Sequence, residues 1–172
     1  MLFRSVLLNK VDLADPKATK EWTEFFTKQG ITVLAIDSKS GKGNKKLIST
    51  VERLSKPIID RWVAKGIRSR SVRTIILGIP NVGKSTLINS LAGSAATRTA
   101  NKAGHTRGQQ WVKIGKNLEL LDTPGVLWPK LEDQRAAARL AMTGAVSDDV
   151  YDLEHVMKQL LNHLLTNRSE ER

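Results

Sequence analysis

The sequence contains no cysteine, which excludes disulfide bonds and thiolate zinc sites. Aromatic residues make up only 5% of the 172 residues, and this argues against a surface that stacks nucleic-acid bases. All apolar runs are far shorter than the roughly 20 residues that a membrane-spanning helix needs, so we expect no membrane partner. The lack of cysteine also fits a reducing compartment, and the segment after Met1 does not resemble a signal peptide. These absences together predict a cytoplasmic protein.

The sequence has a large excess of basic over acidic residues. Lysine and arginine outnumber aspartate and glutamate by 28 to 17, which gives a net charge of +11. A basic surface of this size favours a polyanionic partner such as RNA, contacted through its phosphates rather than its bases. The alternative is a soluble protein that happens to be basic. The apolar share of 40% is typical of a globular protein, and a chain of this length can bury a hydrophobic core.

Short apolar runs alternate with amphipathic segments, and this alternation predicts an α/β domain. The expected strands are Val6–Leu8, Ile31–Ile36, Thr74–Leu77, Gln110–Ile114 and Leu118–Leu121, of which the last two form a hairpin. The expected helices cover residues 16–29, 47–62, 84–91, 135–142 and 150–164. Pro57 should kink or restart the second helix, and Lys65 to Arg73 should form a basic linker.

The segment Gly78-Ile79-Pro80-Asn81-Val82-Gly83-Lys84-Ser85 matches the phosphate-binding P-loop pattern in full, between an expected strand and an expected helix. Backbone N–H groups would converge on phosphate oxygens there, aided by the positive end of the helix dipole. Lys84 would reach the β- and γ-phosphates, Ser85 would hold Mg²⁺, and Thr86 would contact the α-phosphate. The full expected phosphate-binding set is Asn81, Val82, Gly83, Lys84, Ser85 and Thr86. An accidental glycine-rich turn is the alternative.

A second segment, Asn9-Lys10-Val11-Asp12, indicates which base is bound. The Asp12 carboxylate can accept hydrogen bonds from N1–H and the 2-amino group of guanine, whereas adenine would leave it unpaired. Asn9 would position the loop, and the Lys10 stem would lie against the face of the base. Ser38 and Lys39 would cover the base near its O6 atom. Alone the tetrapeptide could equally be a surface turn, but beside a P-loop it predicts a guanine site.

The segment Asp122-Thr123-Pro124-Gly125 follows the last expected strand. Asp122 would bind Mg²⁺ through water, and the Gly125 N–H would contact the γ-phosphate. Thr106 precedes the hairpin and could complete the Mg²⁺ shell when GTP is bound. We therefore expect Lys84, Thr106 and Gly125 to serve catalysis, and Ser85, Thr106 and Asp122 to hold Mg²⁺. An ordinary Pro-Gly turn is the alternative.

Together these motifs resemble those of the translation-factor-like GTPases in a shuffled order. Asn9–Asp12 precedes the P-loop, which precedes Thr106 and Asp122–Gly125. That order is the hallmark of the circularly permuted GTPases. Within them, the chain is similar to the ribosome biogenesis GTPase A (YlqF) type, as far as about Val146. The stretches that carry this likeness are Gly78 to Asn89, Gln109-Gln110-Trp111-Val112-Lys113 and Leu120 to Pro129.

The resemblance implies a permuted, three-layer P-loop NTPase fold with a mostly parallel sheet and one antiparallel hairpin strand. It also implies a monomeric cytoplasmic GTPase that uses GTP or GDP with Mg²⁺, acts late in assembly of the large (50S) ribosomal subunit and contacts its ribosomal RNA. Residues 1–148 would form the GTPase domain, and residues 149–172 would begin a helical region. A GTPase of small-subunit assembly and a GTP-gated RNA-binding module with negligible catalysis are the alternatives; the Gln-Gln-Trp and Val-Leu-Trp-Pro stretches argue against the first.

The motifs do not include a side chain that would orient the attacking water. Val126 follows Gly125, where many GTPases place a glutamine that orients water, and a valine side chain cannot do so. His105 lies beside Thr106 and could assist, or it could be an ordinary loop histidine. Asn81 resembles the asparagine that helps to hold K⁺ in potassium-activated GTPases, or it merely suits the turn.

Proteins of this type carry a strand, and before it a histidine thought to assist hydrolysis, upstream of the Asn-Lys-x-Asp segment. Neither is recognisable here, so we expect a GTPase domain that is incomplete at its N-terminus. The absent strand would belong between Val6–Leu8 and Thr74–Leu77. The sheet should then be interrupted there, or those two strands should close up and move Asn9 and Asp12 toward the P-loop by one strand spacing, roughly 4.8 Å.

Overall fold

The structure is a computed structural model that describes residues 4–67, 71–93, 109–115, 117–127, 133–147 and 151–167. The described residues form two compact units. Unit 1 lies within Met1–Ile76, Gly83–Arg98 and Gln110–Asp122, and unit 2 lies within Leu77–Val82, Thr99–Gln109 and Thr123–Arg172. The P-loop segment passes from unit 2 into unit 1 between Val82 and Gly83.

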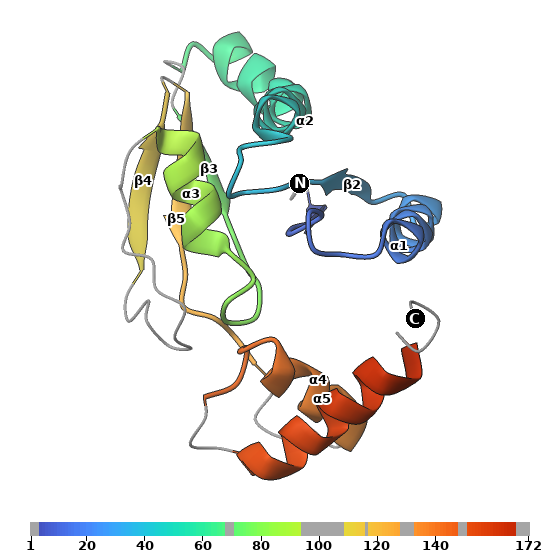
Figure 1. The fold of residues 1–172 in the computed structure, drawn as a ribbon. Coiled ribbons are helices and arrows are strands. Elements are labelled where there is room, and N and C mark those ends of the chain that lie inside the picture. The colour runs from blue at the N-terminus through green and yellow to red at the C-terminus, as the bar shows by residue number, and fades with distance from the viewer. Residues whose placement is uncertain are drawn as a thin grey trace. The chain divides into compact units, whose positions relative to one another are not determined.

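The described strands of unit 1 form two sheets (Figure 1). In the first, β1 (Ser5–Leu8) pairs in parallel with β2 (Thr32–Ala35). In the second, β5 (Leu118–Asp122) lies between β3 (Val72–Ile75), to which it is parallel, and β4 (Gln110–Ile114), to which it is antiparallel. The expected α/β class, the parallel pairing and the single antiparallel hairpin strand are confirmed.

The sheet is interrupted at the place expected from the sequence. β1 and β3 each pair on one side only, and no ladder joins them among the described strands. The side chain of Ile75 on β3 is left 56% exposed. Of the two expected outcomes, the structure therefore has the gap and not the closed sheet.

Two helices of unit 1 begin where the sequence provides a start signal. α1 (Pro16–Lys28) has proline in its first turn, and the Asp15 carboxylate accepts a hydrogen bond from the Lys17 N–H at 2.9 Å. α2 (Asn44–Ala64) begins after Gly43, whose φ of 97° lies in the left-handed region. α2 does not restart at Pro57 but runs through it as one helix. Proline removes one N–H donor, and the packing of Leu47, Thr50 and Ser55 elsewhere on α2 offsets that loss.

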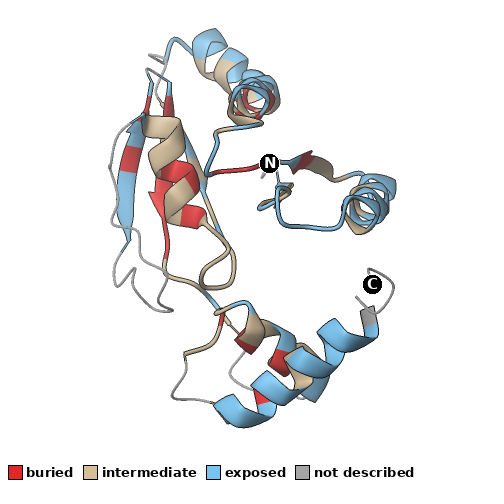
Figure 2. Cartoon of the chain, in the orientation of Figure 1, coloured by how far each residue is buried: buried red, intermediate tan, exposed pale blue. Residues whose placement is uncertain are grey.

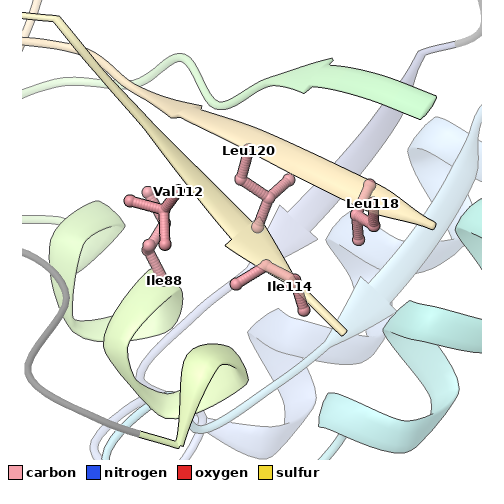
Figure 3. Packing of buried hydrophobic residues seen from close by; sticks show 5 residues of the cluster. All are labelled: Ile88, Val112, Ile114, Leu118 and Leu120. Atoms are coloured by element: carbon pink, nitrogen blue, oxygen red, sulfur yellow. The ribbon is translucent and has the colours of Figure 1, made fainter. Parts of the chain in front are cut away.

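The core of unit 1 is built from two clusters of aliphatic side chains. The first lies between α3 (Lys84–Ala92) and the sheet β3–β5–β4 (Figure 3), and its buried members are Ile88, Val112, Ile114, Leu118 and Leu120. The second contains Leu34, Ile36, Leu47 and Leu87 and joins β2 to α2 and α3. The partly buried side chains of Val51, Ile76 and Leu91 pack against both clusters.

Unit 2 contains α4 (Gln134–Met142) and α5 (Leu153–Asn167), which pack against each other. Asp133 caps α4 by accepting hydrogen bonds from two backbone N–H groups. Val156 of α5 is buried, but the helix is otherwise largely exposed (Figure 2). The predicted apolar stripe is therefore mostly unburied, since Leu153, Met157 and Leu164 are 40–58% exposed. None of the helices in the described part of the chain is both long and apolar enough to cross a membrane.

The start of β3 differs from the expected boundary. Val72 and Arg73 were expected to end a basic linker, but both belong to the strand. Arg73 pairs with Glu119 across the sheet, with 3.1 Å between Nε and Oε2, and its guanidinium lies 5.0 Å from the centre of the Trp111 ring. These cross-strand partners compensate for the low strand propensity of a charged residue.

We expect Ile88→Ala to lower the free energy of unfolding by about 2–5 kcal/mol, because it opens a cavity in a fully buried position of the first cluster. Leu13→Ala removes a side chain that is 79% exposed and should change this free energy by less than about 0.5 kcal/mol. Urea denaturation followed by circular dichroism measures both. Equal effects of the two substitutions would contradict this description of the core.

Candidate functional site

The part of the P-loop that lies in unit 1 forms the start of α3. Gly83 occupies the N-cap position with a φ of 95°, a conformation that L side chains rarely adopt. No side chain caps the helix there. The first-turn N–H groups of a helix that begins in this way, together with its dipole, favour an anion at the N-terminus. The predicted strand–loop–helix context of the P-loop is thus present.

Three predicted residues meet at this end of α3. The Ser85 hydroxyl donates a hydrogen bond to Asp122 Oδ2 at 2.8 Å. Lys84 is buried, with 8% of its surface exposed, and burial lowers the pKa of its ammonium group while the Asp122 charge partly opposes this effect. The sequence placed Lys84, Ser85 and Asp122 at one site, and the structure brings them together.

The second carboxylate oxygen of Asp122, Oδ1, is buried and could approach a cation. Asp122 is 2% exposed, and its Oδ1 atom is buried without a hydrogen-bond partner. An unpaired buried carboxylate oxygen is costly unless a cation or donor approaches it. Carboxylate and hydroxyl oxygens are also the ligands that Mg²⁺ prefers. The pair of Ser85 and Asp122 therefore fits the Mg²⁺ that the sequence predicts for these residues.

The predicted guanine loop and the predicted base-covering loop are joined through Asn9. Asn9 Oδ1 accepts a hydrogen bond from the Ser38 hydroxyl at 2.8 Å and another from the Ser38 backbone N–H at 3.1 Å. The other end of the Asn9 amide lies against the P-loop, because a Cβ on Gly83 would stand only 2.5 Å from Asn9 Nδ2. Asn9 therefore links three backbone segments, a role that the sequence pattern did not reveal in full.

The remaining residues of these two loops are more exposed. Lys10 has a φ of 61°, so the loop turns sharply before Asp12, whose side chain is exposed. Lys39 follows Asp37, which is buried and accepts hydrogen bonds from the backbone N–H groups of Lys39 and Ser40. Hydrogen bonding by the Ser40 side chain, and then by these N–H groups, lowers the pKa of Asp37. Asp37 thereby fixes the backbone that carries Lys39.

The other half of the P-loop belongs to unit 2. Asn81 has a φ of 59°, and its Nδ2 atom donates a hydrogen bond to the Gly144 carbonyl at 2.6 Å. Gly125 lies so close to Pro80 that a Cβ there would stand 2.5 Å from two Pro80 atoms. The Val126 N–H donates to the Gly78 carbonyl at 3.1 Å. Unit 2 thus contains Gly125 and the first half of the P-loop in direct contact.

Some predicted residues cannot be placed, and one partner was not foreseen. Thr106 and His105 lie outside the described residues. Gly144 was not predicted, because a backbone carbonyl that accepts a hydrogen bond has no side-chain signature in the sequence. The only signal is that Thr143-Gly144 ends a helix, as glycine commonly does.

Comparison with known proteins connects this geometry to a family. The chain is 50% identical to ribosome biogenesis GTPase A of Bacillus pumilus over 96% of its own length and 58% of that protein. It is 40% identical to the protein of the same name from Thermotoga maritima over 82% of its length and 47% of that protein. The chain therefore spans less than two thirds of the length of these curated relatives.

A solved structure agrees with this relationship. The GNP-bound crystal structure of YlqF from T. maritima matches 96% of this chain and 59% of that chain, with a TM-score of 0.65 and 30% identity. The resemblance drawn from the motifs is thus confirmed, as is the P-loop NTPase fold. The family model described as "50S ribosome-binding GTPase" matches residues 73–170, which is more than half of the sequence, and the chain belongs to this family.

Proposed function

We propose that this chain binds GTP with Mg²⁺ and hydrolyses it during assembly of the large ribosomal subunit. The observation that carries the proposal is the buried group at the start of α3. There the Ser85 hydroxyl is bonded to Asp122, the second Asp122 oxygen lacks a hydrogen-bond partner, and Lys84 is buried alongside. A bound triphosphate would bring negative charge to Lys84, and its Mg²⁺ would bring positive charge to Asp122.

Each residue has a distinct role in the proposed site. The α3 N-terminus and Lys84 hold the β- and γ-phosphates, and Thr86 holds the α-phosphate. Ser85 and Asp122 would hold Mg²⁺, Ser85 directly and Asp122 through water. Mg²⁺, when bound, neutralises charge on the phosphate oxygens. Burial of Lys84 supports this role, since a desolvated ammonium gains more from a phosphate than an exposed one.

Guanine recognition is proposed for the loops that Asn9 joins. Asp12 accepts hydrogen bonds from N1–H and the 2-amino group of guanine, while Lys10 and Lys39 flank the base. The double hydrogen bond from Ser38 to Asn9 supports this arrangement, because it fixes the two loops next to each other. Exposure of Asp12 fits a carboxylate that is available to a ligand.

The proposed partner is the large ribosomal subunit, contacted through ribosomal RNA by a monomeric cytoplasmic protein. The description of the family as ribosome-binding and the names of the curated relatives support this partner. The net charge of +11 supports contact with RNA phosphates.

The residue after Gly125 favours one alternative function, in which the chain binds GTP with negligible hydrolysis. Val126, which follows Gly125, is 64% exposed and offers no atom that orients water. If K⁺ takes part, its ligand on Asn81 has to be Oδ1, because Nδ2 donates to Gly144. Gly125 and Thr106 remain proposed catalytic residues in addition to Lys84. A GTP-gated RNA-binding module with negligible catalysis is therefore the second candidate.

Single-turnover hydrolysis of labelled GTP distinguishes these two functions. We expect slow hydrolysis by the chain alone and faster hydrolysis with purified large subunits, because the chain shows no water-orienting glutamine after Gly125. Co-sedimentation with a non-hydrolysable GTP analogue should retain the chain on large but not on small subunits. GTP-dependent co-sedimentation without any hydrolysis would favour the binding module, and preference for small subunits would overturn the proposed partner.

We expect Lys84→Ala to abolish triphosphate binding, because it removes the buried positive charge. Ser85→Ala should lose mainly the part of the affinity that depends on Mg²⁺. Titration of a fluorescent GTP analogue with and without Mg²⁺ measures both effects. Wild-type affinity in Lys84→Ala would refute the phosphate site.

We expect Asp12→Asn to weaken GTP binding by about 1.5–3 kcal/mol, since a charged double hydrogen bond is removed. The same variant should gain affinity for xanthosine triphosphate, because an amide can donate where xanthine accepts. Competition between the two nucleotides gives the change in preference. Unchanged GTP affinity would show that Asp12 does not read the base.

A further inference from the structure

The segment that contains α2 carries a large share of the unbalanced positive charge. Between residues 42 and 65, seven cations oppose the two carboxylates of Glu52 and Asp60, which gives +5 of the net +11. The seven cations are Lys42, Lys45, Lys46, Arg53, Lys56, Arg61 and Lys65, and all of them are exposed. We call Lys45, Lys46, Arg53 and Lys56 the α2 basic face.

The four side chains of the α2 basic face project from one side of the helix. At 100° per residue they fall within a sector of about 100°, with Lys46 and Arg53 two turns apart and Arg53 and Lys56 one turn apart. The residues that α2 buries, Leu47, Thr50 and Ser55, occupy other positions. Together with Arg61, the cations extend along about 24 Å of helix at 1.5 Å per residue. These cations form a charged surface along α2, and Asp60 is the carboxylate that falls within the same sector.

These charges are not neutralised within unit 1. Across the residues that the structure describes, none of the seven cations forms a salt bridge. Lys45 and Lys46 lie in the first turn of α2, which contains no acidic residue. Cations in this position are repelled by the positive end of the helix dipole. This repulsion destabilises the start of α2, and a bound polyanion would reduce it.

We propose that the α2 basic face docks on the phosphate backbone of double-helical RNA. The identification of the polyanion as RNA rests on the proposed function, whereas the location of the surface rests on the geometry of α2. Between Lys45 and Arg61 no large apolar side chain is exposed, and Val63 near the end of α2 is the one such side chain on this helix. A single valine is a weak anchor for an interfacial helix, so the basic stretch favours a polyanion over a membrane. The face also presents no exposed aromatic side chain for base stacking, and it therefore binds phosphates.

The chain provides a matched control on α1. Lys17, Lys20 and Lys28 are also exposed helical lysines, but two carboxylates, Glu21 and Glu24, lie between them, whereas only Glu52 lies between Lys45 and Lys56. The test variant is Lys46→Gln with Arg53→Gln and Lys56→Gln, and the control variant is Lys17→Gln with Lys20→Gln and Lys28→Gln. Both lower the net charge by the same amount, and glutamine preserves helix propensity.

Binding of a labelled RNA duplex of about 20 base pairs, followed by fluorescence anisotropy between about 50 and 200 mM salt, tests the proposal. The test variant should bind at least about tenfold more weakly than the full wild-type chain. Its plot of log affinity against log salt should be less steep by about 3, because each phosphate that is no longer neutralised lowers the slope by about one unit. The control variant should keep nearly the wild-type slope. Circular dichroism and titration of the fluorescent GTP analogue should be the same for all three proteins.

The outcomes separate this proposal from the proposed function. Equal weakening in both variants would show that only net charge matters and would overturn the α2 site, while GTP binding and ribosome association could stand. No RNA binding by the wild-type chain, or preferential binding to vesicles with anionic lipid, would overturn it as well. Selective weakening in the test variant with intact GTP binding supports it.

Discussion

Side-chain packing joins the two sheets of unit 1, since no strand ladder connects them among the described strands. Val51 of α2, Ile76 after β3 and Leu91 of α3 each pack against both hydrophobic clusters, whereas β1 and β3 share no ladder in the described structure. Side-chain packing is non-directional, while a strand ladder fixes register and spacing. The relation between the two halves of the sheet therefore depends on how well three aliphatic residues fill the space between α2, α3 and the strands.

The candidate site depends directly on this packing. Asn9 follows β1 in one sheet, whereas Ser85 lies on α3, which covers the other sheet. Asn9 nevertheless reaches Gly83, where a Cβ would stand 2.5 Å from its Nδ2 and would force the amide to move. The same glycine adopts the left-handed backbone that begins α3. Gly83 thus meets both a conformational and a steric requirement, and this places the loop that begins at Asn9 next to the start of α3.

The sequence predicted the start of a helix correctly where the residues at that position allow few backbone conformations. Asp15-Pro16 located the start of α1, and the P-loop pattern located Gly83 and the start of α3, because capping and positive φ strongly restrict the residues allowed. Boundaries set by tertiary contacts were missed. β3 begins at Val72 because β5 lies beside it, and α2 continues through Pro57 as part of a helix that packs through Leu47, Thr50 and Ser55. The Asn81–Gly144 hydrogen bond joins positions 63 residues apart through a backbone carbonyl, so no pattern of side chains could have predicted it.

The Arg73–Trp111 contact also has an optical consequence. An indole ring with a guanidinium 5.0 Å from its centre emits in the field of that charge, and its emission shifts when the charge moves. Trp111 lies near the start of β4, a few residues after Thr106 in sequence, and is 44% exposed. The chain therefore contains an intrinsic fluorophore on the strand that follows a proposed metal ligand. The difference spectrum between the wild-type chain and Trp111→Phe would isolate its signal from those of the other three tryptophans, without any added label.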